Sequence, residues 1–199
     1  SGTHYETRLS DKPVPTNVAE LVAESITKQS LLHRSKQIEG VTDPRSLNYW
    51  DLINFGDRFV SMDPEQINLR REFLNYAVAS APTLAIGHAA LGKLLSWEVI
   101  NGIALNPKQH VDLAIECATT AVDIDPNAPY VTSSSGLINS RVGQYRLGIE
   151  LCRQALLAAP STQAKDALAM SLCFAGQPEE AIELYLQVFA STPAGQVFN

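Results

Sequence analysis

Apolar side chains recur at helical spacing along most of the chain, and prolines interrupt them at a fixed interval. Pro126, Pro160 and Pro193 lie 34 and 33 residues apart, and each closes a stretch with an Ala- and Leu-rich face. A period of about 34 residues with two helices per unit is typical of a helical solenoid, in which each unit buries its apolar face by stacking on its neighbours. The pattern therefore predicts an all-α solenoid of antiparallel helix pairs.

Four helix pairs are predicted between residues 46 and 193. Gly176 and Pro178 stand where a helix end and a first helical turn favour these residues. Pro82 and Pro126 are 44 residues apart rather than 34, so the second pair carries about ten extra residues, which we place around 99–107. The expected helices are 46–60 and 65–80, 84–100 and 108–124, 128–141 and 144–158, and 162–175 and 178–191.

The first part of the chain has a different pattern. Residues 4–9 are predicted to form a short extended strand, and the prolines that follow disfavour an early helix. A helix is expected from Asn17, with Glu20 at the spacing of a capping box and apolar residues along one face. We therefore expect an N-terminal extended segment with a linker helix at 1–45 and a helical repeat domain at 46–199.

The repeats resemble the tetratricopeptide repeat, whose first helix carries a Leu-Gly pair and whose second carries Ala, an aromatic residue, Ala and a closing Pro. The stretch 176–185, Gly-Gln-Pro-Glu-Glu-Ala-Ile-Glu-Leu-Tyr, matches that pattern best, followed by 121–127, Ala-Val-Asp-Ile-Asp-Pro-Asn. The chain departs from it where Ala118 and Cys152 replace the aromatic residue and Ala169 replaces the glycine. The resemblance implies a right-handed α-α superhelix that binds protein or peptide partners.

A second, shorter resemblance covers the beginning of the chain. Residues 4–9, His-Tyr-Glu-Thr-Arg-Leu, and 47–52, Leu-Asn-Tyr-Trp-Asp-Leu, look like the linker region of bacterial winged-helix transcriptional regulators and class III nucleotide cyclases. The resemblance implies that residues 1–9 end a preceding α/β domain and that the repeats form the sensory or assembly part of a transcriptional regulator. The alternative that it leaves open is a small-molecule-sensing domain that regulates an attached DNA-binding or cyclase domain.

Composition narrows the classes of function. The net charge of −6 argues against direct nucleic-acid binding, which needs clustered Lys and Arg. No apolar run approaches the roughly 20 residues that span a bilayer, so no membrane segment is expected. The three cysteines, Cys117, Cys152 and Cys173, sit in helical patterns without metal-site spacing. We expect them to be buried small residues of a cytoplasmic protein. The chain opens on Ser1 rather than Met, as a fragment would.

Two stretches resemble catalytic or nucleotide-binding motifs, but their neighbouring residues and predicted secondary structure do not fit those motifs. Residues 87–93 have the Gly-x-x-x-x-Gly-Lys spacing of a phosphate-binding loop, but Leu94 follows instead of Ser or Thr and the stretch lies in a predicted helix. Residues 133–136, Ser-Ser-Ser-Gly, lack the strand and turn of a nucleophile elbow and are expected to face a groove. The four histidines share no metal-ligand spacing. We therefore expect no catalytic residues, cofactor or metal, and no enzymatic activity.

The concave surface, lined by the first helix of each pair, is the predicted binding groove. Aromatic side chains with a few charges suit an extended peptide or a helix. Trp50 and Trp97 belong either to this groove or to the core. Only Lys93 and Arg141 are basic there, which disfavours a free acidic C-terminus as ligand. Alignment of the pairs on their small residues places toward the groove Trp50, Ile53, Asp57, Lys93, Trp97, Tyr130, Ser133, Leu137, Arg141, Asp166 and Met170.

The last residues bear on oligomeric state. A solenoid normally ends in a polar capping helix, whereas the residues after Pro193 include the apolar Val197 and Phe198. Either this end packs on a second copy, giving a homodimer, or the chain continues beyond it.

Overall fold

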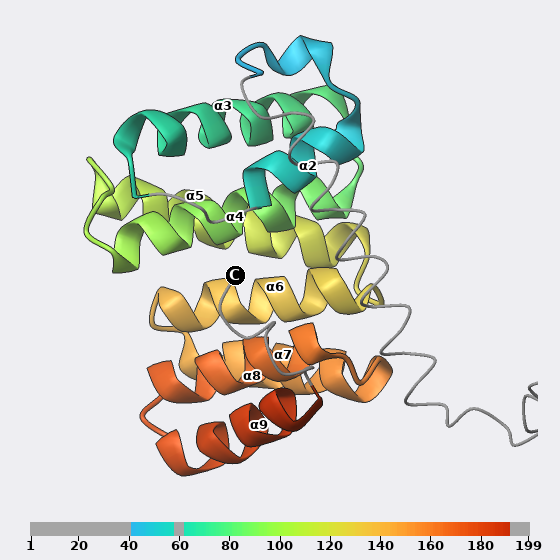
Figure 1. Ribbon diagram of the computed structural model, residues 1–199, viewed down its shortest axis with the longest axis vertical. Coiled ribbons are helices and arrows are strands. Elements are labelled where there is room, and N and C mark those ends of the chain that lie inside the picture. The colour runs from blue at the N-terminus through green and yellow to red at the C-terminus, as the bar shows by residue number, and fades with distance from the viewer. Residues whose placement is uncertain (1–40, 58–61, 192–199) are drawn as a thin grey trace, which may run out of the picture.

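A computed structural model describes residues 41–57 and 62–191 of the chain. This part contains one 3₁₀ turn and eight α-helices and no strand (Figure 1). The strand predicted at 4–9 and the helix predicted from Asn17 lie outside it, so the domain division at residue 45 stays a prediction. The elements are η1 (Pro44–Ser46), α2 (Tyr49–Asp57), α3 (Pro64–Ser80), α4 (Ala85–Ile100), α5 (Pro107–Ile124), α6 (Pro129–Arg141), α7 (Tyr145–Ala158), α8 (Thr162–Phe174) and α9 (Pro178–Ser191).

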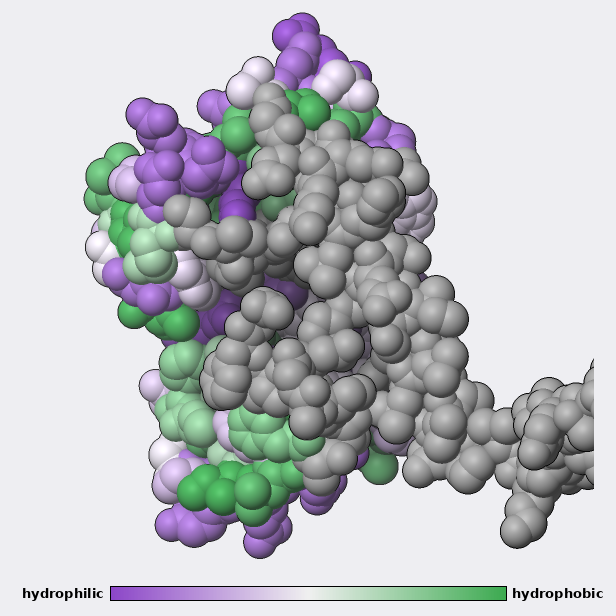
Figure 2. Space-filling view, in the orientation of Figure 1, coloured by the Kyte–Doolittle hydropathy of each residue, from purple (hydrophilic) through white to green (hydrophobic). Residues whose placement is uncertain are grey.

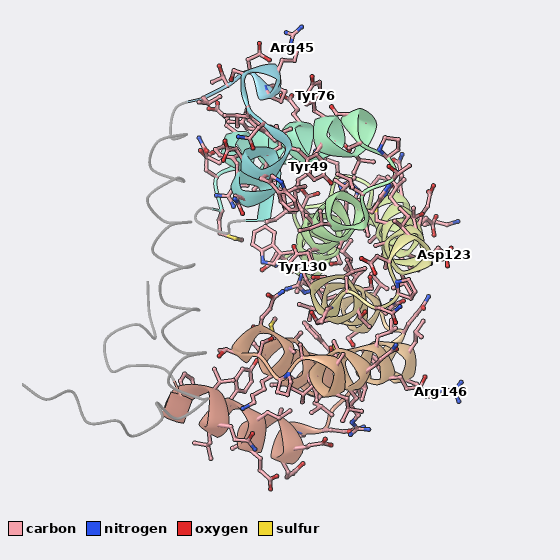
Figure 3. All side chains as sticks on the ribbon, turned by 90° about the vertical axis from the view of Figure 1, so that its right-hand side faces the viewer. Arg45, Tyr49, Tyr76, Asp123, Tyr130 and Arg146 are labelled. Atoms are coloured by element: carbon pink, nitrogen blue, oxygen red, sulfur yellow. The ribbon has the colours of Figure 1, made fainter. Side chains whose placement is uncertain are left out.

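The helices stack in chain order as antiparallel pairs, which confirms the predicted solenoid (Figure 1). Seen from the side, the stack is a crescent, with the first helices of the pairs toward its inner side and α3, α5 and α7 along its outer edge (Figure 3). Tyr49 and Tyr130 lie on the inner side, while Asp123 and Arg146 lie at the outer edge (Figure 3). The fold therefore presents two different faces, and Tyr130 of the predicted groove lies on the inner one.

Local sequence sets the helix boundaries. Asp63 and Asn106 cap α3 and α5 by accepting hydrogen bonds from backbone amides of the first turn, and a proline follows each. Ser161 caps α8 in the same way, at 3.1 Å from the amide of Ala164. Proline needs no amide partner at the first helical position, and short polar side chains satisfy the amides that remain. Seven of the predicted helices are therefore correct to within one residue at each end that the structure describes.

The helix predicted from Ser46 begins later than expected. Asp43 and Pro44 start a 3₁₀ turn instead, and Leu47 is extended. Asn48 then caps α2, since its Oδ1 accepts from the amide of Asp51 at 3.0 Å and its Nδ2 donates to the Asp51 carboxylate at 2.7 Å. Asn48 therefore sets the start of α2, because its side chain accepts a hydrogen bond from an amide of the first turn.

Glycines allow α6 and α7 to approach backbone to backbone. A Cβ atom added to Gly136 would lie 2.5 Å from Cys152 Sγ and 2.7 Å from the carbonyl oxygen of Gly148. Cys152 is completely buried in this contact, and its thiol donates to the carbonyl oxygen of Ser133 at 3.6 Å. A larger side chain at Gly136 would have to push the two helices apart. This crossing also explains why a cysteine replaces the aromatic residue of the repeat pattern here.

The core forms along the stack in neighbouring clusters. The first spans α2 to α6 and includes Phe73, whose ring lies 4.5 Å from that of Phe55. A second joins α6 to α9 around Leu168 and Leu172. Each cluster takes side chains from adjacent pairs, so that every pair is stabilised by its neighbours.

The ten extra residues of the second pair lengthen both of its helices. Helix α4 has 16 residues against 13 in α6, and α5 has 18 against 14 in α7. The equivalents of Arg141 and Tyr145 are Trp97 and Val111, with thirteen residues between them where the third pair has three, so the ten extra residues lie within 98–110. The predicted 99–107 falls inside this span, and the added residues also continue the helices on both sides of the turn.

A buried carboxylate ties this extension to the first pair. Glu98 of α4 is fully buried, and Arg71 of α3 donates to its Oε1 from Nε at 3.1 Å and from Nη2 at 2.8 Å. Nε2 of His110, in α5, lies 2.8 Å from Glu98 Oε2, and its Nδ1 lies 3.0 Å from the carbonyl oxygen of Asn106. The contacts of Glu98 thus join three helices where the extension leaves the regular repeat.

The substitution Gly136→Ala tests the close crossing of α6 and α7. We expect it to lower the free energy of unfolding by about 1–3 kcal/mol, because the added methyl group meets backbone rather than a movable side chain. Urea denaturation measures the loss. Glu150→Ala, on the exposed side of α7, is the control and should change stability by less than about 0.5 kcal/mol. Equal stabilities for the two variants would contradict the crossing.

The substitution Arg71→Met tests the charge cluster. It leaves the Glu98 carboxylate buried without its arginine partner, and we expect a loss of about 2–3 kcal/mol. Adding Glu98→Met should restore part of this loss, because the buried charge is then gone. Arg146→Met on the outer edge is the matched control. The free energies of unfolding of the two single variants and the double variant are measured in urea. If the losses from Arg71→Met and Glu98→Met simply add, the two side chains are not coupled.

Candidate partner-binding surface

The predicted groove residues occupy the first helices of the pairs, but they differ in exposure. Trp50 is 61% exposed and Asp166 is also exposed. Asp57 ends α2, and its side chain lies outside the described part. Ile53, Ser133 and Leu137 are buried, and the half-buried residues are Lys93, Trp97, Tyr130, Arg141 and Met170.

Lys93, Tyr130 and Arg141 form a cluster across α4 and α6. Lys93 Nζ lies 5.4 Å from the centre of the Tyr130 ring, within the range of a cation–π interaction. Arg141 Nη1 donates to the carbonyl oxygen of Lys93 at 3.2 Å. Both cations of the predicted groove therefore bridge α4 and α6: Lys93 of α4 contacts the Tyr130 ring of α6, and Arg141 of α6 bonds to the backbone of α4. Tyr130 itself points to the inner side of the crescent (Figure 3).

Asp166 of α8 brings a negative charge to the same region. Partial burial raises the pKa of its carboxyl group, while the positive charges of Arg141 and Lys93 lower it in part. Beyond it, burial raises the pKa of Tyr185 in α9 to about 12, and the charges of Asp166 and Cys173 act in the same direction. The inner face therefore changes sign along the stack, from cations on α4 and α6 to a carboxylate on α8.

Some of the predicted groove residues are buried beneath the inner face instead of lining it. Ser133 Oγ donates to the carbonyl oxygen of Tyr130 at 3.2 Å, and Leu137 belongs to the second core cluster. Trp97 packs against the first core cluster, whereas Trp50 contacts Tyr49 edge to face at 5.8 Å and is mostly exposed. Of the two tryptophans, Trp50 therefore offers contact area and Trp97 divides its surface between core and face.

The serine run of α6 is placed differently from the prediction. Ser135 is completely buried, and its hydroxyl donates to the carbonyl oxygen of Ala118 in α5 at 3.2 Å. It therefore faces the neighbouring pair rather than a groove. Small hydroxyl-bearing residues let α5 and α6 approach here, and the buried hydroxyl of Ser135 is hydrogen-bonded across the contact.

Tyr185 is the residue of this region that the groove prediction missed. It occupies the aromatic position of the repeat pattern in α9, yet the prediction considered only first helices. Its ring packs partly on the second core cluster and lies within electrostatic reach of Asp166. The sequence did point to this residue, because the last pair keeps the aromatic residue of the repeat pattern at position 185.

The motifs excluded on sequence grounds lie in regular helices. Residues 87–93 fall inside α4, and residues 133–136 fall inside α6. Within the described ranges, no group of three His, Cys, Asp or Glu side chains is arranged to hold a metal ion. None of the helices described is long and apolar enough to cross a bilayer.

The cysteines divide into two buried and one exposed. Burial raises the pKa of the Cys117 thiol to about 12 and that of Cys152 to about 11. Cys173 is exposed near the end of α8, so the prediction that all three are buried was wrong for this residue. Its position on the side of α8 away from the core explains the difference.

A shallow cavity of about 360 Å³ lies apart from the inner face. It is formed where the start of α7 meets the turn between α8 and α9, and Arg146 at its rim lies on the outer edge of the crescent (Figure 3). Its lining residues are Tyr145, Arg146, Ile149, Glu150, Arg153, Ala175 and Gln177.

Comparison with known proteins identifies the fold. No family model and no curated protein matches the chain. Among solved structures, TTC0263, a thermophilic TPR protein of Thermus thermophilus, is similar with a TM-score of 0.60 and 19% identity, covering 89% of each chain. MamA (residues 41 to the end) of Desulfovibrio magneticus RS-1 gives a TM-score of 0.49 and 14% identity, covering 87% of this chain and 89% of that one. The first similarity shows that the chain has the tetratricopeptide-repeat fold.

Thiol reactivity tests the placement of the cysteines. At pH 8 we expect one thiol, Cys173, to react rapidly with a disulfide reagent. Cys117 and Cys152 should react only after unfolding, since thiols with pKa values of about 12 and 11 carry little thiolate at that pH. Cys173→Ser should abolish the rapid phase in a stopped-flow assay. Two rapid phases in the folded protein would contradict the structure.

Proposed function

We propose that the chain is a non-enzymatic protein-interaction module that binds a segment of a partner protein along its inner face. The observation that carries this proposal is the cluster of Lys93, Tyr130, Arg141 and Asp166, which three successive first helices bring together. A helical scaffold holds such side chains in place, so that little conformational freedom is lost on binding.

The charges and aromatic rings of the inner face suggest what the partner segment carries. An acidic side chain suits the region of Lys93 and Arg141, and a basic or hydrogen-bond-donating side chain suits Asp166. An apolar side chain suits Trp50, which is broad, rigid and 61% exposed. We therefore propose an internal segment of mixed charge rather than a free acidic C-terminus.

We further propose that the module acts on an attached effector domain of a bacterial transcriptional regulator. The support is the resemblance of residues 4–9 and 47–52 to regulator linkers, of which 4–9 lie outside the described residues. Binding would shift such a domain between states only if the partner has different affinities for them. The three free cysteines favour a reducing compartment such as the cytoplasm.

Small-molecule sensing is the second candidate, and the cavity beside α7 favours it. Arg146 at that cavity would suit an anionic metabolite, with Tyr145 and Ile149 against its apolar part. A thermal-shift screen with anionic metabolites separates the candidates, because a ligand of the cavity raises the melting temperature in a way that Arg146→Ala removes.

Peptide selection tests the interaction proposal. A phage-displayed library of peptides with blocked termini is selected on the protein, and affinities of the winning peptides are measured by calorimetry. We expect Lys93→Glu with Arg141→Glu to weaken binding at least tenfold at unchanged helicity. Lys108→Glu with Arg146→Glu, exposed residues of α5 and α7, makes the same change of charge and should have little effect.

The outcomes separate the two surfaces. Binding that survives the inner-face charge reversals and is lost with the control reversals would overturn the proposal and move the binding site to the outer edge. Failure to select any peptide, with a metabolite stabilising the protein, would favour sensing instead.

A further inference from the structure

The outer side of α9 carries an apolar stripe. Ala181 is buried on the inner side of this helix, and Leu184 and Tyr185 pack on the second core cluster. The other side exposes Ile182, Leu186 and Phe189 by 57%, 62% and 48%. Their spacing of four and three residues aligns them along the helix, and we call them the α9 stripe. Figure 2 shows a hydrophobic patch over α9 at this end of the molecule.

Earlier repeats show what this position of the helix normally meets. Ile149 and Leu156 of α7 stand 33 residues before Ile182 and Phe189, and they pack into the second core cluster with residues of α8. Val122 of α5, 34 residues before Leu156, packs on a third, smaller cluster that α4, α5 and α6 share and that includes Val131. In each case a following helix covers the apolar residues. The α9 stripe is therefore the kind of surface that another helix covers.

The middle residue of the stripe departs from the earlier repeats. At its equivalent position in α7 stands Arg153, whose Nη2 donates to both oxygens of Glu180 in α9 at 2.9 and 3.0 Å. This contact ties α7 to a helix of the following pair. In α9 the position is Leu186, so the stripe is continuous and apolar and lacks the charged tether to a further repeat.

We propose that the stripe is covered by α9 of a second copy of this chain, running antiparallel about a two-fold axis at Leu186. Leu186 lies near the middle of the stripe, so such an axis sets it against Leu186 of the partner subunit and sets Ile182 near Phe189 of the partner subunit. An isologous contact needs this self-complementarity.

The charges of α9 favour the same orientation. All of them, on Glu179, Glu180 and Glu183, lie in the first six residues of the helix, and residues 184–191 carry none. Antiparallel pairing sets each acidic end beside the uncharged half of the other helix. Parallel pairing would bring six carboxylates together without a counter-charge on either helix.

The proposal does not depend on the proposed function of the inner face, although it adds to it. Pairing through α9 would join two copies of that face in one assembly, which strengthens binding to a partner with two matching segments. Three large side chains from each copy make a small interface, so the dimer is expected to be reversible and to depend on concentration.

Sedimentation velocity over a concentration series tests the proposal. We expect the protein to pass from monomer to dimer as its concentration rises. Leu186→Glu should weaken association at least tenfold, because it sets two carboxylates face to face at the axis. Leu157→Glu, at an 86% exposed leucine of α7, makes the same substitution elsewhere and should dimerise like the unaltered protein. Circular dichroism checks that both variants remain folded.

Two further variants test the two-fold axis itself. Mixing Leu186→Glu with Leu186→Lys should restore the dimer, since opposite charges then meet at the axis, while each alone remains monomeric. Leu186→Cys in a Cys173→Ser background should form a disulfide-linked dimer under mild oxidation.

Several results would overturn the proposal. They are a monomer at every concentration, a dimer that Leu186→Glu leaves intact, and a mixture of the charged variants that stays monomeric. Deletion of residues 192–199 distinguishes another occupant. If the unaltered protein is monomeric and the deletion variant dimerises through Leu186, the C-terminal segment covers the stripe instead of a second copy.

Discussion

The approach of α6 and α7 at Gly136 and Gly148 is the constraint on which the rest of the structure depends. A methyl group added at Gly136 would collide with the sulfur atom of Cys152 and with backbone of the opposite helix. Side chains cannot separate the helices there, so their relative position is set by backbone contact. Helix α6 packs between α4 and α8, and this crossing therefore also fixes where Tyr130 and Arg141 lie on the inner face.

The inner face and the α9 stripe differ in polarity. The inner face combines cations, a carboxylate of raised pKa and aromatic rings, which favour selectivity among partners and steering of their approach. The α9 stripe is apolar and continuous, which favours assembly by burial of surface. One chain thus carries a polar surface suited to recognition and an apolar surface suited to association, on separate helices of the same rigid stack.

Much of the fold followed from local sequence, because helix boundaries depend on caps, prolines and glycines within a few residues. Gly143 and Gly176, for example, take the positive φ values that end α6 and α8. Burial was harder to predict. The register of α6 placed Ser133 and Leu137 on the inner face, yet neighbouring helices enclose them. The charge cluster of Glu98 joins residues 27 and 12 positions away, which no local pattern reveals.

Native-state hydrogen exchange, followed amide by amide, tests most directly whether the α6–α7 crossing is the stable centre of the molecule. Exchange from a solenoid reports the stability of each pair together with its neighbours. We expect the amides of α6 and α7 to exchange last and those of α9 to exchange clearly earlier. Exchange from α6 as fast as from α9 would contradict the central role of the crossing, because the inner face would then lack the fixed scaffold on which its residues depend.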